Sequence, residues 1–499
     1  MIGARDANVG RLSDGVFDTL IVGGGITGMG IALDLAARGA RVALAEKADF
    51  ASGTSSRSSK LVHGGLRYLA QYQFSVTRES LEERDRLARL APDLVATLPF
   101  LIPCRGGPLA VARLAAGLSL YDAMSHGSGR RFTHCSPSGA QRLAPWMRVD
   151  DLDTTFVYWD CQTDDAALVL AVGAQAGSRG AVLANYCAVV SVQPDGDRHV
   201  AVIRDGIRGH ETIARARSIV CATGAWSPGS IRGASEHSLT VRPSKGVHLF
   251  LKRDRFPLRC ACYLPTGIDN RLIFVVPWHD RVLVGTTDTD YGGAVDRPTV
   301  EPEDVDYLLA ALRHNRRDFG LSRDDVVGAQ AGLRPLVRTD QASTRASREE
   351  HVWSADNRVI GITGGKLTTY RRMAERVGTT VAGWLGLPRA PVTRDLPIAP
   401  RTVNVESSPS PSIAPSEAQI NRWIRETGAC RVGDVLARRS RLLLLDHRSA
   451  IRASGAVADV MAGELDWSNE QRARELEVFA READAHGLPE WRTDGYSAA

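Results

Sequence analysis

A glycine-rich turn near the N-terminus constrains the fold of this chain more than any other feature. Gly23, Gly25 and Gly28 follow the apolar run 17–22, which predicts a buried strand of a parallel sheet, and they lead into residues 26–38, which predict a helix. In this pattern the first glycine permits a tight turn, the second lets the backbone approach a pyrophosphate, and the third lets helix and strand pack closely. The turn therefore predicts a dinucleotide site at the helix N-terminus.

A second strand and a later glycine turn bear on which dinucleotide is bound. Residues 41–46 predict the next strand, and Glu46 ends it about 20 residues after the turn, where a carboxylate can hold a ribose hydroxyl. No second glycine motif of this quality follows, but Gly224 ends another strand-to-glycine turn, far along the chain. This layout favours a two-part FAD site over a nicotinamide site.

Length, charge and cysteine usage limit the class of protein. The 499 residues exceed one ordinary core, so two or three domains are expected. A formal net charge of +5 is too small to indicate nucleic-acid binding, although it is compatible with an anionic substrate or membrane surface. The eight cysteines form no CxxC motif, so we expect reduced thiols and no metal site. No apolar run reaches about 18 residues, so we expect no transmembrane helix.

The remaining patterns predict the order of the elements. We expect residues 1–15 to be disordered. Further along, the patterns predict an amphipathic helix at 75–90, strand-rich stretches at 197–222 and 245–286, a helix at 301–318, a Pro- and Ser-rich linker at 399–416 and helices over 417–484.

Six longer motifs resemble one family, the FAD-dependent, quinone-linked glycerol-3-phosphate dehydrogenases. The similarity lies in GGGITGMGIALDLAARG (23–39), ASGTSSRSSKLVHGGLRYL (51–69), SKGVH (244–248), VPWHDRVLVGTTDTDY (276–291), GLRPL (332–336) and GGKLTTYRRMA (364–374). The motifs occur in the family's order and at its approximate spacing. The resemblance extends over about residues 17–398.

The resemblance implies an α/β fold in three parts. A doubly wound FAD-binding domain and a mixed-sheet cap domain, which carries the substrate site, are both expected to be discontinuous, and a C-terminal helical domain follows. The expected ranges are 17–90, 150–235 and 325–398 for the FAD-binding domain, 91–149 and 236–324 for the cap domain, 399–416 for the linker and 417–499 for the shortened C-terminal domain.

The resemblance also implies an enzyme. Members of the family oxidise sn-glycerol 3-phosphate to dihydroxyacetone phosphate by hydride transfer from C2 to FAD, and pass the electrons to a quinone. Because quinones reside in the bilayer, we expect a cytoplasmic protein associated peripherally with the inner face of the cell membrane. The electron acceptor, the polyol phosphate and a homodimeric state stay open.

Most residues expected to hold FAD lie in matched stretches, while Glu46 and Lys47 follow the second strand and Gly224 lies at the later glycine turn. The first turn and Glu46 serve the ADP half, and the small residues after position 51, together with 364–368, bring backbone close to the flavin ring. The candidate cofactor-binding residues are Gly23, Gly25, Ile26, Thr27, Gly28, Glu46, Lys47, Thr54, Ser55, Ser58, Ser59, Lys60, Leu61, His63, Gly224, Gly364, Gly365, Leu367 and Thr368.

The substrate would carry a dianionic phosphate, which favours arginine because a guanidinium binds two phosphate oxygens at once. The candidate substrate-binding residues are Arg67, Tyr68, His248, Arg334, Arg348 and Lys366. Oxidation at C2 needs an acceptor for the hydroxyl proton, and His248 is the first candidate because an unperturbed imidazole titrates near neutrality. Alternatively, Lys366 and Arg67 lower the pKa of the hydroxyl electrostatically, and His248 is only a packed histidine on an inward strand face.

Besides two mild departures from the family pattern, at Thr27 and Leu33, the chain departs from it in two places that bear on function. Ala167 stands where the family usually has arginine, so we expect compensation nearby if that arginine supports the FAD-binding domain. The C-terminal domain is abbreviated, which leaves dimerisation and membrane docking open. The insertion that oxidases of this family carry before the domain is absent, which favours a dehydrogenase.

Run 438–448 (RRSRLLLLDHR) is the candidate membrane contact, because it combines basic and apolar residues, although four leucines in a helix are more often core. The alternatives for function are a dehydrogenase for a related polyol phosphate such as erythritol 4-phosphate, an oxygen-using oxidase, a non-catalytic flavin-binding protein and a nicotinamide dehydrogenase.

Overall fold

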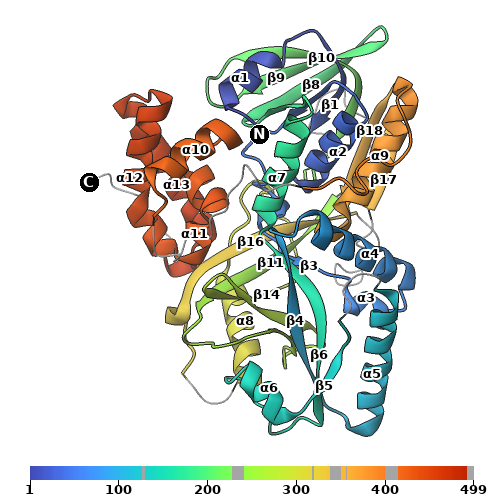
Figure 1. Cartoon of the computed structure of the whole chain (residues 1–499). Helices are drawn as coiled ribbons and strands as arrows, with labels where there is room; N and C mark the ends of the chain where they lie inside the picture. The colour runs from blue at the N-terminus through green and yellow to red at the C-terminus, as the bar shows by residue number, and fades with distance from the viewer. Residues whose placement is uncertain are drawn as a thin grey trace.

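The computed structural model describes residues 1–125, 130–226, 241–316, 320–337, 350–355, 357–398 and 414–491. In this part of the chain, two sheets lie one above the other in the view of Figure 1, and a group of C-terminal helices packs beside them. The predicted fold class is confirmed: a doubly wound layer, a mixed sheet and a helical C-terminal unit. Most of the predicted linker, residues 399–413, lies outside the described residues.

The first sheet contains the predicted βαβ unit. Its main path runs β17-β18-β10-β1-β2-β7, and the strands from β18 to β7 are parallel. Helices α2 (Ile26–Ala37), α7 (Asp165–Gly177) and α9 (Tyr370–Leu385) pack together against it through one apolar cluster. The strands of this sheet are β1 (Val16–Val22), β2 (Val42–Ala45), β7 (Val182–Ala184), β8 (Cys187–Asp195), β9 (Arg198–Asp205), β10 (Glu211–Cys221), β17 (Glu350–Ala355) and β18 (Val359–Gly364).

The second sheet is mixed, since most neighbours are antiparallel but β12 and β4 are parallel. Helices α6 (Pro137–Leu143) and α8 (Pro302–Asn315) pack into one core cluster of this sheet, and α3 (Leu66–Ala70), α4 (Phe74–Leu90) and α5 (Gly107–Met124) into another. Its strands are β3 (Leu61–Val62), β4 (Val95–Cys104), β5 (Thr133–Cys135), β6 (Thr154–Thr163), β11 (Val241–Lys252), β12 (Ala261–Pro265), β13 (Leu272–Trp278), β14 (Arg281–Gly285), β15 (Thr289–Asp290) and β16 (Val326–Val337). Strands β6 and β16 fall in ranges expected for the FAD-binding domain but pair within this sheet.

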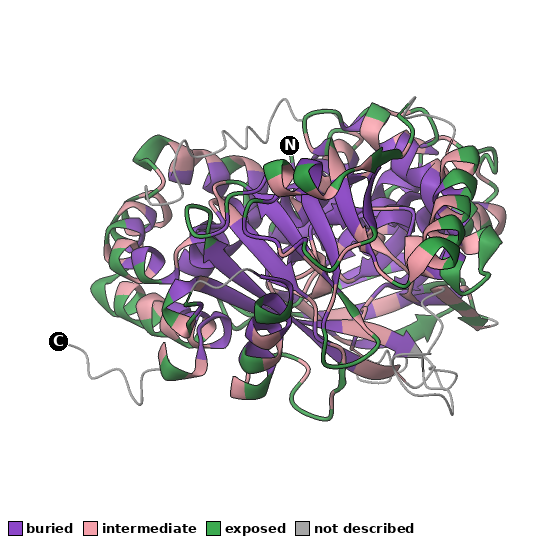
Figure 2. Cartoon of the chain, turned by 90° about the horizontal axis from the view of Figure 1, so that it is seen from below, coloured by how far each residue is buried: buried purple, intermediate pink, exposed green. Residues whose placement is uncertain are grey.

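The C-terminal helices pack against the rest of the protein through α11, α12 and α13, all of which contact β16 (Figure 1). The unit comprises α10 (Glu417–Thr427), a π-helical turn (Asp434–Arg439), α11 (Leu442–Leu445), α12 (His447–Leu465) and α13 (Asn469–His486). Figure 2 shows buried residues concentrated in the strands and in the helix faces that meet them. No helix in the described ranges has the length and apolar character needed to cross a bilayer.

The expected membrane contact at 438–448 is wrong. Arg438 and Arg439 are buried because both bind Asp49, and the four leucines of α11 are buried as well. Leu444 and Leu445 pack into the core cluster on the second sheet. The apolar run therefore faces protein, and Arg438, Arg439 and Arg441 neutralise buried carboxylates instead of meeting lipid headgroups, although Arg448 at the end of the run is exposed.

The expectation of disorder at the N-terminus is also wrong. Residues Arg5–Arg11 form α1, and Arg5 is buried because its guanidinium binds Asp205 at 2.5 Å. The Asn8 amide donates to the carbonyls of Ile2 and Leu183, both at 2.9 Å. Polar side chains that looked solvated in the sequence tie this segment to the first sheet.

Candidate functional site

The glycine turn after β1 has the backbone geometry that a phosphate site needs. Gly23 has φ +111°, in the region that favours glycine, and a Cβ at Gly28 would collide with the Gly23 carbonyl oxygen. Gly25 precedes α2 and provides no side-chain cap, and the Ile26 N–H donates to Ser55 Oγ at 3.0 Å. Ile26 and Thr27 begin α2, as predicted. The Ile26 N–H at this helix N-terminus is thus met by a small hydroxyl group.

The carboxylate of Glu46 lies beside this turn. Its oxygens accept the N–H groups of Gly24 at 2.6 Å and Ala48 at 2.8 Å. Burial raises the pKa of Glu46, although the two N–H groups oppose that rise. The next residue, Lys47, pairs with Asp296 and lies 4.5 Å from the centre of the Trp226 ring. Together with the glycine turn, this acceptor fits the ADP half of FAD, because it places a carboxylate where a ribose hydroxyl is expected.

The serine-rich segment 54–60 is tied down by protein contacts. Thr54 Oγ1 donates to the Leu333 carbonyl at 2.6 Å. Ser58 donates its N–H and its hydroxyl to Asp165, at 3.0 and 2.7 Å. Lys60 is fully buried, and its Nζ lies 2.9 Å from both oxygens of Asp165. The side chains of Ser58 and Lys60 and the backbone N–H of Ser58 are therefore engaged in protein contacts.

His248 lies on β11, opposite Gly285 of β14 and Gln330 of β16. Its Nε2 is 2.8 Å from Ser59 Oγ, and Gln330 donates to its Nδ1 at 3.4 Å. An accepting Nδ1 assigns the ring proton of the neutral imidazole to Nε2, which faces Ser59. Burial, reinforced by the charges of Lys60 and Arg334, lowers the pKa of His248 to about 3. The imidazole is thus neutral at pH 7, but it is a weaker base than the sequence argument assumed.

A second group of predicted residues meets around His63, three residues beyond the serine-rich segment. The His63 N–H donates to Thr368 Oγ1 at 3.1 Å, and Thr368 Oγ1 donates to the His63 carbonyl at 3.3 Å. Lys366 Nζ donates to Ser80 at 3.1 Å and lies 3.7 Å from the centre of the Tyr68 ring. Leu367 and Thr368 belong to a short 3-10 helix, Leu367–Thr369, Leu61 lies in β3, and Gly364 and Gly365 have positive φ.

The predicted arginines are placed differently from one another. Arg334 lies on β16, and its guanidinium contacts Asp288 at 3.2 Å and donates to Thr286 Oγ1 at 3.0 Å. Arg67 is half-buried on α3, one residue before Tyr68. Arg348 lies outside the described residues. At the later glycine turn, the Gly224 carbonyl oxygen accepts a hydrogen bond from the Thr363 hydroxyl at 3.0 Å, which joins this turn to β18.

Three polar residues in this region were missed by the sequence argument. Gln330 connects His248, Lys60 and the Ser58 carbonyl. Asp165 holds Ser58 and Lys60, and Arg441 reaches it from the C-terminal helices. Asp165 stands two residues before Ala167 and Arg441 stands in run 438–448, but nothing local to either position predicted that they would meet. Gln330 joins the group through its tertiary contacts to His248 and Lys60.

Arg441 also bears on the substitution at Ala167. Ala167 is buried near the start of α7, where its N–H caps onto Asp164. The Nε of Arg441 lies 3.1 Å from the Asp164 carboxylate, while its Nη2 binds Asp165. A guanidinium from the C-terminal unit therefore binds the acidic residues at the beginning of α7, next to the position where Ala167 replaces the family's arginine.

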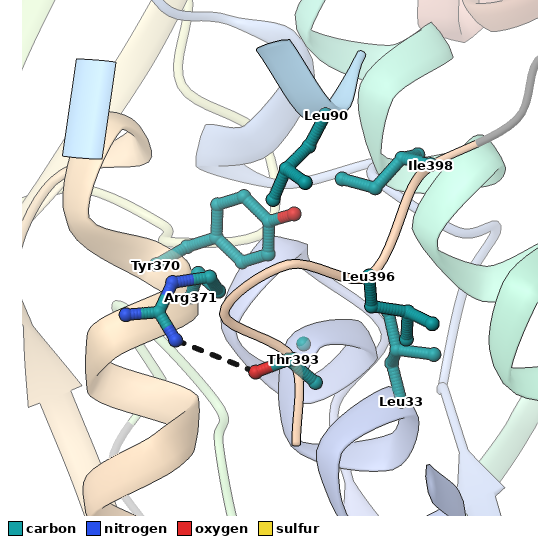
Figure 3. Close-up of a pocket in the computed structure, with 8 residues that line it drawn as sticks. Leu33, Leu90, Tyr370, Arg371, Thr393, Leu396 and Ile398 are labelled. Atoms are coloured by element: carbon teal, nitrogen blue, oxygen red, sulfur yellow. Dashed lines mark hydrogen bonds between the residues drawn. The ribbon is translucent and has the colours of Figure 1, made fainter. Parts of the chain in front are cut away.

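The pocket in Figure 3 is separate from these groups. It lies among α2, the end of α4, α9 and residues 393–398, and most of its lining is apolar. Arg371 reaches its edge but is bound to Glu83 and to Thr393. Among the residues that the structure describes, no predicted substrate-binding residue lines this pocket.

Comparison with known proteins identifies two matching family models. Residues 18–371 match the family described as FAD dependent oxidoreductase, and residues 393–472 match the C-terminal domain of alpha-glycerophosphate oxidase. A glycerol-3-phosphate dehydrogenase of Mycobacterium leprae is 33% identical over 97% of this chain and 90% of that protein. An aerobic glycerol-3-phosphate dehydrogenase of Bacillus subtilis is 35% identical over 75% of this chain and 68% of that protein.

Solved structures give the same picture. The glycerol-3-phosphate dehydrogenase from Bacillus halodurans, complexed with FAD, matches with a TM-score of 0.77 at 28% identity, over 97% of this chain and 98% of that one. An L-alpha-glycerophosphate oxidase from Mycoplasma pneumoniae with FAD bound matches with a TM-score of 0.58 at 16% identity, over 76% of this chain and 97% of that one. At this identity the second match shows likeness of fold alone.

Proposed function

This chain belongs to the family of FAD-dependent glycerol-3-phosphate dehydrogenases, and we propose that it oxidises sn-glycerol 3-phosphate to dihydroxyacetone phosphate and passes the electrons to a quinone. The observation that carries the proposal is the extent of the match, since one relative aligns with 97% of the chain, through both sheets and the C-terminal helices. FAD is the cofactor, and when bound it supplies the acceptor for the hydride from C2.

The residues that would hold FAD are those of the glycine turn, Glu46 and the two loops that approach the flavin ring. The N-terminus of α2 would bind the pyrophosphate through backbone N–H groups, because its N-cap residue Gly25 has no side chain and the Ile26 N–H meets the small hydroxyl of Ser55. Glu46 would accept from a ribose hydroxyl. Segment 58–63 supports this arrangement, since it contacts His248 at one end and Thr368 at the other.

Cations around this segment would bind the substrate phosphate. We assign this role to Arg334, Lys366 and Arg67, because charge-assisted hydrogen bonds are the strong ones for a dianion. Arg334 already contacts Asp288, so phosphate binding would need that carboxylate to share or release the guanidinium. Tyr68 supports Lys366, whose ammonium lies over its ring.

The proton of the C2 hydroxyl would leave by way of His248. The ring is neutral, so it can accept a proton once a substrate oxygen replaces the Ser59 hydroxyl at Nε2 and the ring proton moves to Nδ1, a move that requires the Gln330 amide to stop donating to Nδ1. A pKa of about 3 makes this transfer unfavourable until the surroundings change. Substrate anions would provide such a change, since a nearby negative charge raises the pKa of an imidazole.

The test is anaerobic reduction of the purified, FAD-loaded protein. Glycerol 3-phosphate should bleach the flavin absorption, and a water-soluble quinone analogue should restore it much faster than oxygen does. Glycerol and erythritol 4-phosphate serve as controls for the phosphate and for the chain length. Faster bleaching by erythritol 4-phosphate would make that compound the substrate, and rapid reoxidation by oxygen would make oxygen the acceptor. If none of these compounds bleaches the flavin, the proposal that the protein is an enzyme of this kind is refuted.

A further inference from the structure

We propose that the outward face of α5 docks this protein on an anionic lipid bilayer. The α5 face consists of the exposed residues Leu109, Ala112, Arg113, Ala116, Ser119, Leu120 and Ala123. At 100° per residue these positions span about one third of the helix circumference, so they form a single stripe. The inference rests on the proposed function, because a quinone acceptor requires contact with a membrane.

The composition of α5 is unusual for a helix on the surface. Over 18 residues it carries only two charges, Arg113 and Asp122. Its inner side packs on β4 and β6 through Leu118 and Tyr121, which are buried, yet Leu109 on the other side is 82% exposed. A helix that is apolar all round is normally covered on every side. The α5 face is therefore an apolar stripe that lacks a cover within this chain's described residues.

Exposed aromatic residues stand next to α5. Tyr72 is 81% exposed and Phe74 is 44% exposed, and their rings pack edge to face in the turn that joins α3 to α4. Both α3 and α4 pack against α5, and Figure 1 shows the three helices together on one side of the second sheet. Aromatic rings with a polar end favour the level of the lipid headgroups, which suits Tyr72.

The charges around the stripe complement an anionic surface. Arg113 lies within the α5 face, and Arg130 and Arg131 are exposed just beyond the C-terminal end of the helix. Asp122 is half-buried, and its carboxylate accepts the Phe132 N–H at 2.6 Å. Binding to a membrane surface grows with the apolar area buried in it and with the attraction between basic residues and anionic lipids, and the α5 face offers both. Arginine also favours anionic lipid over the apolar surface of a second copy of the chain.

The inner side of α5 connects the stripe to the flavin loop. The Tyr121 hydroxyl donates to Asp160 at 2.7 Å and lies so close to Gly64 that a Cβ there would stand 2.5 Å from it. Gly64 follows His63 in the segment expected near the flavin. A bilayer against the α5 face would thus be separated from this segment by about one helix diameter, roughly 10 Å. A quinone at the bilayer surface would be near its electron donor.

The test compares two double variants of the full-length, FAD-loaded protein in vesicle flotation. Leu109→Glu/Leu120→Glu places two charges in the α5 face, and Ile213→Glu/Ile268→Glu places two charges on exposed apolar positions elsewhere. We expect wild type to bind phosphatidylglycerol vesicles more tightly than phosphatidylcholine vesicles. The α5 variant should bind phosphatidylglycerol vesicles at least about ten-fold more weakly than wild type does. The control variant should bind as wild type does. Arg113→Gln should reduce binding and its salt dependence.

The readouts separate this inference from the proposed function. All variants should retain FAD, and the α5 variant should still reduce a water-soluble acceptor with glycerol 3-phosphate while losing activity with a quinone held in vesicles. Equal vesicle binding by wild type and the α5 variant would overturn the docking surface. If wild type is a dimer and the α5 variant is a monomer, lipid is not the partner of the α5 face, and the face is assigned to contact with a second copy of the chain. Absence of turnover with any acceptor, with vesicle binding intact, would refute the proposed function alone.

Discussion

Replacing Arg441 with methionine removes one of the two cations that hold the buried carboxylate of Asp165. Arg441 is 2% exposed, binds Asp165 through Nη2 and contacts Asp164 through Nε. Burial acts to raise the pKa of Asp165, but Lys60 and Arg441 outweigh it and hold that pKa below its ordinary value. The variant keeps the Lys60 contacts at 2.9 Å and the two bonds from Ser58, so the carboxylate stays partly compensated.

The expected loss can be estimated from this geometry. Removing one partner of a buried ion pair costs about 3–5 kcal/mol, and the remaining Lys60 puts Arg441→Met at the lower end, about 3 kcal/mol. Asp165→Asn should cost more, because it leaves two buried cations without their shared anion. Arg425→Met is the matched control in the same C-terminal unit, since Arg425 pairs with Glu464 at the surface and should leave stability unchanged.

The assay is urea unfolding of the FAD-loaded protein, followed by tryptophan fluorescence and by flavin release. If the cluster joins the C-terminal helices to the flavin loop, Arg441→Met should lower both midpoints together. Equal midpoints for Arg441→Met and Arg425→Met would refute the reasoning. A drop in the fluorescence midpoint without earlier flavin release would restrict the effect of Arg441 to the C-terminal unit.

Three further predictions concern the site itself. Gly28→Ala should abolish FAD binding, because its Cβ would collide with the Gly23 carbonyl; a normal ratio of flavin to protein absorbance would contradict this. The imidazole of His248 binds its proton near pH 6.5 when unfolded and near 3 when folded, so stability is full above 6.5 and falls by up to a few kcal/mol as pH drops towards 3. His248→Gln should flatten the unfolding midpoint across that window, and an unchanged slope would argue against the burial effect. Arg334→Ala should raise KM for glycerol 3-phosphate by about ten-fold or more, and a KM within error of wild type would remove Arg334 from the phosphate site.

The glycine turn could be predicted from the sequence because its requirements are local. Gly23 and Gly28 are needed for backbone conformation and close packing between adjacent elements, so their spacing alone indicates a strand, a helix and a phosphate site. The boundaries of α2, predicted at 26–38 and observed at Ile26–Ala37, follow from the same short-range pattern. Longer motifs identified the family, and the comparisons confirm both the family and FAD.

Burial and long-range partners were decided only by the tertiary structure. Four leucines in a helix are more often core, but the pattern at 442–445 left a lipid-facing role open, because periodicity does not reveal what covers a helix. The packing of Leu444 and Leu445 on the second sheet and of Leu442 and Leu443 within the C-terminal helices settled the question. The pKa of His248 depends on burial and on Lys60 and Arg334, which are distant in sequence. The sequence by itself determined the nucleotide turn and the family, whereas the environment of each side chain arose only when both sheets and the C-terminal helices packed together, since desolvation and charge act through space.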